Sequence, residues 1–200
     1  MAIKILRRNP AISQDVPDTD DTLAKYSAAF LAEARKVAVL GNHIGIAQVF
    51  EVGRFSPDDP DSNNSSDLGH TFVVFEFVDG LILGSWAAEA KPDHIEIATI
   101  VLKIAESLAY VHKQGIFHRD VKPTNVIVNK ASQPILIDFG LAFDWKEDFS
   151  RLNPLACTPA YASPEQFGNN LNSLDGRTDI YACGVILYEL LSSYKITPQA

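Results

Sequence analysis

The pattern of apolar and polar positions divides the chain into short strands followed by longer helices. Apolar runs bounded by turn residues predict strands at 1–6, 48–52, 71–78 and 135–137, with one more ending at Val128. Apolar residues at helical spacings predict helices over 22–40, 93–115 and 178–191. Strands and one helix come first, helices dominate later and no repeat is present, so the predicted fold class is α+β. We expect two lobes with a hinge near 76–80.

Two of the predicted helices carry further signals. Asp93 is followed three residues later by Glu96, and this capping box predicts a helix that begins at that point. The stretch 178–191 is apolar on nearly every side, which predicts a helix buried all round in a larger helical body.

Glu33 interrupts the apolar stripe of the helix predicted over 22–40. A carboxylate on the buried face of a helix is costly unless a cation meets it, so this position calls for a Lys or Arg from elsewhere. Alternatively, Glu33 lies at the edge of the stripe and its carboxylate reaches water. The helical pattern alone leaves both interpretations open.

Composition narrows the classes of function. The formal net charge of -8 over 200 residues argues against a nucleic-acid partner, because binding to phosphate backbones depends on cationic side chains. The longest strongly apolar run, 181–191, is shorter than the roughly 18 residues of a membrane span and contains Glu189. We therefore expect no membrane segment in this chain. Two cysteines and an N-terminus unlike a signal peptide predict a cytoplasmic protein.

Polar residues gather in two segments that follow apolar elements. The first, 118–125, is His-Arg-Asp-Val-Lys-Pro-Thr-Asn, and the second, 138–140, is Asp-Phe-Gly directly after a predicted strand. Asn125 and Asp138 stand at two adjacent strand ends, where they can share a divalent cation, since Mg²⁺ takes few hard oxygen ligands from protein and adds water and phosphate.

Two further residues of the first segment fit the same chemistry. Asp120 would be a carboxylate beside the metal but not bound to it, free to accept a hydroxyl proton. Lys122, two residues on, would offset charge on a transferring phosphoryl group.

These segments resemble the catalytic loop H-R-D-x-K-P-x-N and the D-F-G motif of eukaryotic-type protein kinases. The resemblance extends in both directions: 2–4 (Ala-Ile-Lys) is similar to the third-strand V-A-I-K motif, and 158–165 is similar to the end of an activation segment. The amino-acid sequence of 158–166 most resembles that of bacterial members of the serine/threonine class. The resemblance implies a two-lobed protein-kinase-like fold, with 1–78 as a partial N-lobe and 79–200 as a partial C-lobe.

The resemblance also implies a role for each matching residue. Asp120 would be the base and Lys122 its cationic neighbour, while Asn125 and Asp138 would hold Mg²⁺. His118 would pack as a structural residue.

Further matches concern nucleotide binding and regulation. Lys4 would grip the α- and β-phosphates of ATP and supply the cation that Glu33 calls for, and the backbone of Glu76 and Val78 would bind adenine. Elsewhere in the chain, Phe75 would be the gatekeeper, Asp179 would brace the catalytic loop, and Arg119 would meet a phosphate on the activation segment, for which Ser150 is the best-placed acceptor.

The implied activity is transfer of the ATP γ-phosphate to Ser or Thr hydroxyls of a protein substrate. The Gly-rich loop, the first two strands and the last helices of the family are not found in this sequence, so we expect an incomplete fold. Met1 occupies the valine position of V-A-I-K, so we expect the natural start to lie upstream. The alternative is a truncated, weakly active or inactive kinase-like binding or scaffold module. A small-molecule phosphotransferase ranks last, because that class normally lacks Lys122-Pro123.

Overall fold

The structure is a computed structural model that describes residues 1–5, 31, 34–35, 37–38, 40, 42–55, 70–139, 158–167 and 175–192. The chain divides into two compact units, one comprising 1–41, 48–77 and 141–144 and the other 42–47, 78–140 and 145–200. Most of the helix predicted over 22–40 lies outside the described residues, as do Glu33, Gly140 and Ser150.

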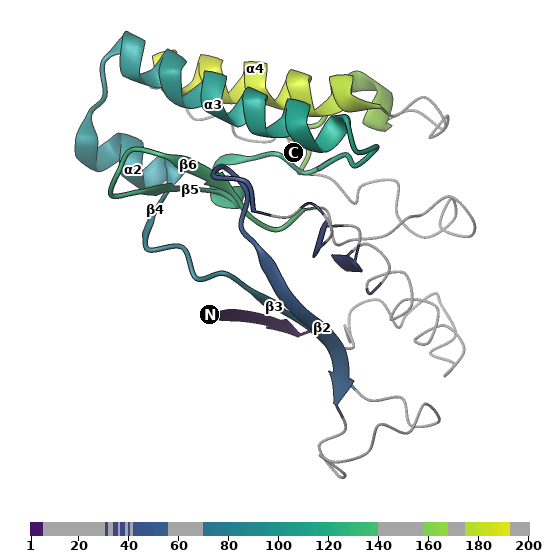
Figure 1. Cartoon of the computed structure of the whole chain (residues 1–200). Coiled ribbons are helices and arrows are strands. Elements are labelled where there is room, and N and C mark those ends of the chain that lie inside the picture. Colours follow the sequence, from purple (N-terminus) through teal and green to yellow (C-terminus); the bar gives the residue numbers. More distant parts are fainter. Residues whose placement is uncertain are drawn as a thin grey trace, which may run out of the picture. The chain divides into compact units, whose positions relative to one another are not determined.

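The first unit contains an antiparallel sheet of three strands, β1 (Ala2–Ile5), β2 (Val49–Phe55) and β3 (His70–Phe75). Their order is β1-β3-β2, so β3 is the central strand (Figure 1). Val73 and Val74 of β3 are buried, whereas every residue of β1 is exposed. Strand β2 is longer than predicted because its pairing with β3 continues to Phe55↔His70.

The second unit contains another antiparallel sheet, formed by β4 (Gly80–Ile82), β5 (Val126–Asn129) and β6 (Pro134–Leu136) in that order. Val126 and Leu136, which face each other across β5 and β6, are almost fully buried. Strand β4 and the helix that follows it, α2 (Leu83–Ala90), were not predicted from the sequence.

Two long helices, α3 (His94–His112) and α4 (Gly176–Ser192), lie side by side in the second unit (Figure 1). The predicted capping box at the start of α3 is confirmed: Asp93 Oδ1 accepts from the N–H groups of Ile95 and Glu96, and Glu96 Oε2 accepts from Asp93 N–H. None of the helices in the described part of the chain is long and apolar enough to cross a membrane.

Helix α4 is buried on one face only. Ala182, Cys183 and Ile186 are buried, whereas 49% of Ile180 and 60% of Tyr188 are exposed. In the described residues α3 covers one side of this helix, so burial on all sides is not observed and apolar side chains such as Ile180 and Tyr188 remain exposed. The α+β class is confirmed by the two small sheets and the helices.

Candidate active site

The segment between α3 and the short 3₁₀ helix η1 (Pro123–Asn125) carries the predicted catalytic residues. Arg119 has a φ of 63°, a left-handed conformation that residues with a side chain rarely adopt. Asp179 of α4 holds this turn, because its carboxylate accepts the Arg119 N–H at 2.7 Å and the His118 N–H at 2.9 Å. Only 1% of Asp179 is exposed, so both charge-assisted bonds lie in the interior.

The same carboxylate contacts the end of α3. His112 Nε2 lies 2.7 Å from Asp179 Oδ2. One buried side chain therefore joins the last turn of α3, the predicted catalytic segment (residues 116–125, called the catalytic segment below) and the first turn of α4. This places the backbone of residues 118 and 119 relative to both helices.

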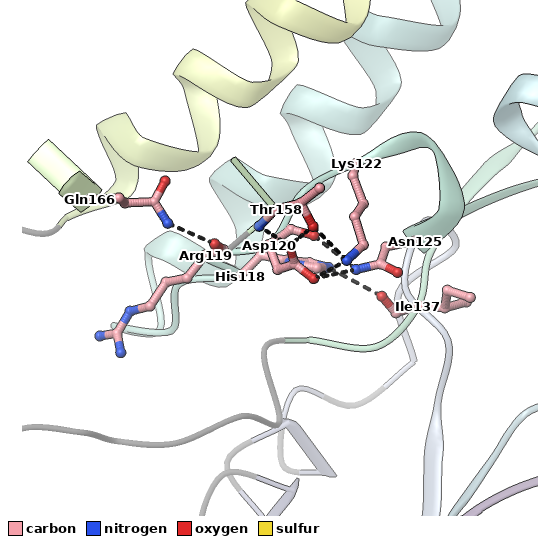
Figure 2. A network of polar contacts seen from close by, with 8 residues as sticks. All are labelled: His118, Arg119, Asp120, Lys122, Asn125, Ile137, Thr158 and Gln166. Atoms are coloured by element: carbon pink, nitrogen blue, oxygen red, sulfur yellow. Dashed lines mark hydrogen bonds and ion pairs between the residues drawn. The ribbon is translucent and has the colours of Figure 1, made fainter. Parts of the chain in front are cut away.

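The Asp120 carboxylate is the centre of a polar network (Figure 2). Lys122 Nζ donates to Asp120 Oδ2 at 2.6 Å, and Asn125 Nδ2 donates to the same oxygen at 3.2 Å and to the Asp120 carbonyl at 2.8 Å. About a quarter of the Asp120 and Lys122 side chains is exposed (25% and 24%), so the pair lies at the surface of the fold and can be reached from solvent. Of the three residues predicted to be catalytic, Asp120 is thus in direct contact with the other two.

Thr158, 38 positions after Asp120 in the sequence, also belongs to this network. Its Oγ1 donates to Asp120 Oδ1 at 2.9 Å, its N–H donates to the same oxygen at 3.3 Å, and its Oγ1 accepts from Lys122 Nζ at 2.8 Å. Asp120, Lys122 and Thr158 therefore form a closed triangle of hydrogen bonds. Both oxygens of Asp120 are oriented by neighbours, as a positioned proton acceptor requires.

The two predicted metal ligands come from paired strands. Val126 of β5 faces Leu136 of β6. Just beyond this pair, the Ile137 N–H donates to the Asn125 carbonyl at 2.9 Å. Asp138 directly follows Ile137 in the sequence, so it lies one residue from a hydrogen-bond partner of Asn125. The Nδ2 of Asn125 donates to Asp120, and its Oδ1 would be the atom that ligates a cation. An amide oxygen and a carboxylate fit the hard-oxygen preference of Mg²⁺.

In the described ranges, no group of three or more His, Cys, Asp or Glu residues is placed so that it could hold a metal ion. A cation at Asn125 and Asp138 would therefore take its remaining ligands from water and from a phosphate-bearing substrate, which is the usual arrangement for Mg²⁺. The donor set of the protein fits this ion.

His118 is fully buried and packs rather than facing the network around Asp120. Its Nε2 lies 3.2 Å from the Ile137 carbonyl, its ring lies 4.8 Å from that of Phe139, and its Nδ1 has no hydrogen-bond partner among the described residues. These contacts join the catalytic segment to the residues around Asp138 and agree with the structural role predicted for His118.

The residues predicted to bind nucleotide lie in both units. Lys4 is in β1, opposite Val73 of β3, and the Lys4–Glu33 pair stays a prediction because Glu33 is outside the described residues. The Glu76 N–H donates to the Gln48 carbonyl at 2.8 Å, so Glu76 would offer its carbonyl to a nucleotide. Val78 is buried beside Ala47 and Ile135.

The segment 158–167 is anchored on α4. The Tyr161 hydroxyl donates to Glu189 at 2.7 Å, and burial together with this contact raises the pKa of Tyr161 well above its usual range, so the phenol stays a donor. Glu165 Oε1 accepts from the Thr178 hydroxyl at 3.1 Å. The backbone N–H of Glu165 and the hydroxyl of Ser163 hold the pKa of the Glu165 carboxyl below its usual range.

Sequence reasoning missed Gln166. It lies in η3 (Pro164–Phe167), and its Nε2 donates to the Arg119 carbonyl at 3.0 Å. The two residues are 47 positions apart, so no local pattern could have indicated the contact.

Comparison with known proteins gives consistent matches. Residues 28–200 match the family described as "Protein kinase domain". The chain is 33% identical over 201 residues to "Serine/threonine-protein kinase PknF" of Mycobacterium tuberculosis, which covers 96% of this chain. It is also 33% identical over 195 residues to "Probable serine/threonine-protein kinase PknB" of Lactococcus lactis, again over 96% of this chain.

The fold is shared with a solved structure described as "PpkA-294 apo form", with a TM-score of 0.67 and 23% identity. That match covers 92% of this chain and 61% of the solved chain. This chain spans 37% of PknF and 27% of PknB, so it corresponds to only a part of each of these relatives.

Proposed function

Because this chain belongs to the protein kinase family, with similarity to bacterial serine/threonine members, we propose that it transfers the γ-phosphate of ATP to Ser or Thr hydroxyls of a protein substrate. One observation carries the proposal: Asp120 is held simultaneously by Lys122, Asn125 and Thr158, although these residues lie up to 38 positions apart in the sequence. This arrangement suits an oriented carboxylate beside a cationic group, as phosphoryl transfer requires.

In the proposed reaction, the substrate hydroxyl oxygen forms a bond to the γ-phosphorus while the bond from that phosphorus to the β-γ bridging oxygen breaks. The hydroxyl proton passes to the Asp120 carboxylate, and ADP leaves with the bridging oxygen. Lys122, 2.6 Å from Asp120, would offset negative charge on the transferring group. Thr158 would keep both side chains oriented.

Asn125 and Asp138 would hold Mg²⁺, which supplies neutralisation of the phosphate charge. The proposal for these residues is supported by their neighbouring positions at the ends of β5 and β6. Asn125 would serve twice, because its Nδ2 orients Asp120 while its Oδ1 remains for the cation.

For the nucleotide we propose the roles implied by the family. Lys4 would bind the α- and β-phosphates and pair with Glu33, and the backbone of Glu76 and Val78 would bind adenine. The partition into an N-lobe at 1–78 and a C-lobe at 79–200 belongs to the same proposal.

The direct test is phosphate transfer from γ-labelled ATP to Ser- and Thr-containing peptides in the presence of Mg²⁺. Asp120→Asn should lower the rate by about 10²- to 10⁴-fold, the usual contribution of a positioned base, while nucleotide binding stays nearly intact. Asp79→Asn is the matched control, because Asp79 also pairs with a lysine at 2.6 Å, Lys130, but both side chains are largely exposed.

Transfer that is equally fast in the unmodified chain and in Asp120→Asn would contradict the role of Asp120. Tight nucleotide binding without any transfer by the unmodified chain would contradict the kinase proposal and favour a binding or scaffold module instead. Transfer to small alcohols but to no peptide would favour a small-molecule phosphotransferase.

A further inference from the structure

The side chain of Gln166 uses both ends of its amide inside the fold. Only 7% of the residue is exposed. Its Oε1 accepts from the Ser163 N–H at 2.9 Å and from the Ser163 hydroxyl at 3.3 Å, and its Nε2 donates to the Arg119 carbonyl at 3.0 Å. A buried amide with both ends satisfied is held in a single orientation.

The carbonyl that Gln166 binds belongs to the peptide group that directly precedes Asp120. On the other side of the same residue, the Arg119 N–H is bound by Asp179. Both backbone polar groups of Arg119, a residue with φ 63°, are thus fixed by side chains from two different elements, α4 and η3. Rotation of the peptide between Arg119 and Asp120 would break the Gln166 bond and leave a buried amide unpaired.

Two residues of the segment 158–167 form hydrogen bonds with the catalytic segment in the described structure. Thr158 binds the Asp120 carboxylate and Lys122, and Gln166 binds the Arg119 carbonyl. One contact therefore holds the carboxylate, and the other holds the backbone from which it projects. Figure 2 shows the two contacts on either side of Asp120, with the Arg119 guanidinium pointing away from the network.

We propose that Gln166 is a positioning residue for phosphoryl transfer. It keeps the Arg119–Asp120 peptide in the orientation that aims the Asp120 carboxylate at the substrate hydroxyl, and it makes this orientation depend on the order of the segment 158–167. The inference rests on the proposed function. Gln166 reaches the reaction only through the backbone before Asp120, so its loss should lower kcat and leave the KM for ATP unchanged.

Two variants separate the two ends of the amide. Gln166→Met removes both bonds, whereas Gln166→Glu keeps the acceptor for Ser163 but places a carboxylate oxygen against the Arg119 carbonyl. Gln133→Glu is the matched control, because Gln133 Nε2 also donates to a backbone carbonyl at 3.0 Å, that of Pro134 in the β5–β6 hairpin.

The measurements use the full chain and are kcat per nucleotide-binding site, KM for ATP and amide hydrogen exchange. Both Gln166 variants should lower kcat by about 10- to 100-fold with KM for ATP within about twofold, since small misplacement of a reacting group is costly. In both Gln166 variants, amide hydrogen exchange over residues 117–122 should be at least about tenfold faster than in the unmodified chain, and exchange over residues 94–112 should be unchanged. Gln133→Glu should alter none of these values.

Several results would overturn the proposal. Unchanged kcat in Gln166→Glu, with a loss only in Gln166→Met, would mean that the bond to Ser163 alone matters and that Gln166 supports only the turn of η3. A loss of nucleotide-binding sites together with faster exchange across 94–112 would indicate general unfolding rather than positioning. If the unmodified chain bound nucleotide but transferred no phosphate, the proposed function would be wrong. The role of Gln166 is tested separately: unchanged amide hydrogen exchange over residues 117–122 in Gln166→Glu would exclude it as a positioning residue.

Discussion

Strand β1 and the catalytic segment 116–125 both carry kinase motifs, yet the structure supports them in different ways. In the described part of the chain, strand β1 pairs with one neighbour, β3, and its Ile3 and Ile5 are 59% and 38% exposed. The catalytic segment is bound by side chains from α4 and η3, and by Thr158.

This difference shows that a clear sequence motif does not by itself make a well-supported site. Among the described residues, β1 is held by its ladder of backbone pairing with β3. The backbone of residues 118 and 119 is held by the buried side chains of Asp179 and Gln166. We therefore expect substitutions in the catalytic segment to affect chemistry sharply and substitutions in β1 to act mainly through nucleotide affinity.

The largest effect should come from Asp138→Asn. This substitution removes a proposed ligand of Mg²⁺ and changes none of the hydrogen bonds described above for Asp120. We expect about a 10³-fold loss of transfer together with about tenfold weaker Mg²⁺-dependent nucleotide binding, because a neutral amide is a poorer ligand for the cation than a carboxylate. Asp120→Asn should lose transfer while keeping binding. Equal loss of nucleotide binding in the two variants would contradict this division of roles.

A thiol introduced on β1 and the native thiol of Cys183 in α4, the helix that supports the catalytic segment, should react at very different rates. Burial raises the pKa of Cys183 to about 12, and only 5% of the residue is exposed, so its thiolate is scarce and shielded. Ile3→Cys would place a thiol on exposed β1. We expect iodoacetamide at mildly alkaline pH to modify residue 3 at least about 100-fold faster than residue 183, as followed by mass spectrometry of the digested protein. Similar rates would show that the buried face of α4, which carries Cys183, is accessible to the reagent.

Lys4→Met should have a smaller effect, confined to the nucleotide. Loss of one cation that binds phosphates should weaken the affinity for an ATP analogue by about tenfold, measured by titration. Lys130→Met is the control, since Lys130 is 82% exposed and pairs with Asp79. An affinity unchanged by Lys4→Met would mean that β1 does not contribute to the nucleotide site.

The smallest effect should come from the cap of α3. Asp93→Ala removes the bonds to the Ile95 and Glu96 N–H groups and should lower the free energy of unfolding by about 1 kcal/mol in urea titration. Asp93→Ser keeps an oxygen that can accept these bonds and should stay close to the unmodified value. No loss in Asp93→Ala would show that the second unit does not depend on this helix end.

Local signals predicted part of this structure well. The Asp93–Glu96 pair indicated the start of α3 because both hydrogen-bond partners lie within three residues, and the resemblance to kinases gave the grouping of Asp120, Lys122 and Asn125. In both cases the information needed was carried by a short stretch of chain.

Other features depend on the fold and could not be predicted in this way. Helix α2 was missed because its N-cap, Ile82, makes no side-chain capping bond and the helix has only 8 residues, including Gly84. Strand β3 was predicted to run to Val78 because the apolar run continues, but Val78 packs with Ala47 and Ile135 in the second unit. Gln166 acts across 47 residues, a separation at which side-chain periodicity carries no information.

The left-handed turn at Arg119 has a consequence for protein engineering. Its φ of 63° is maintained by Asp179, 60 residues later, and by Gln166, 47 residues later. A graft of residues 118–125 into an unrelated scaffold would leave both partners behind, and the turn would relax to a conformation that side chains favour. Transplanting this catalytic loop therefore requires moving the start of α4 and η3 with it, so the smallest portable catalytic unit is discontinuous in sequence.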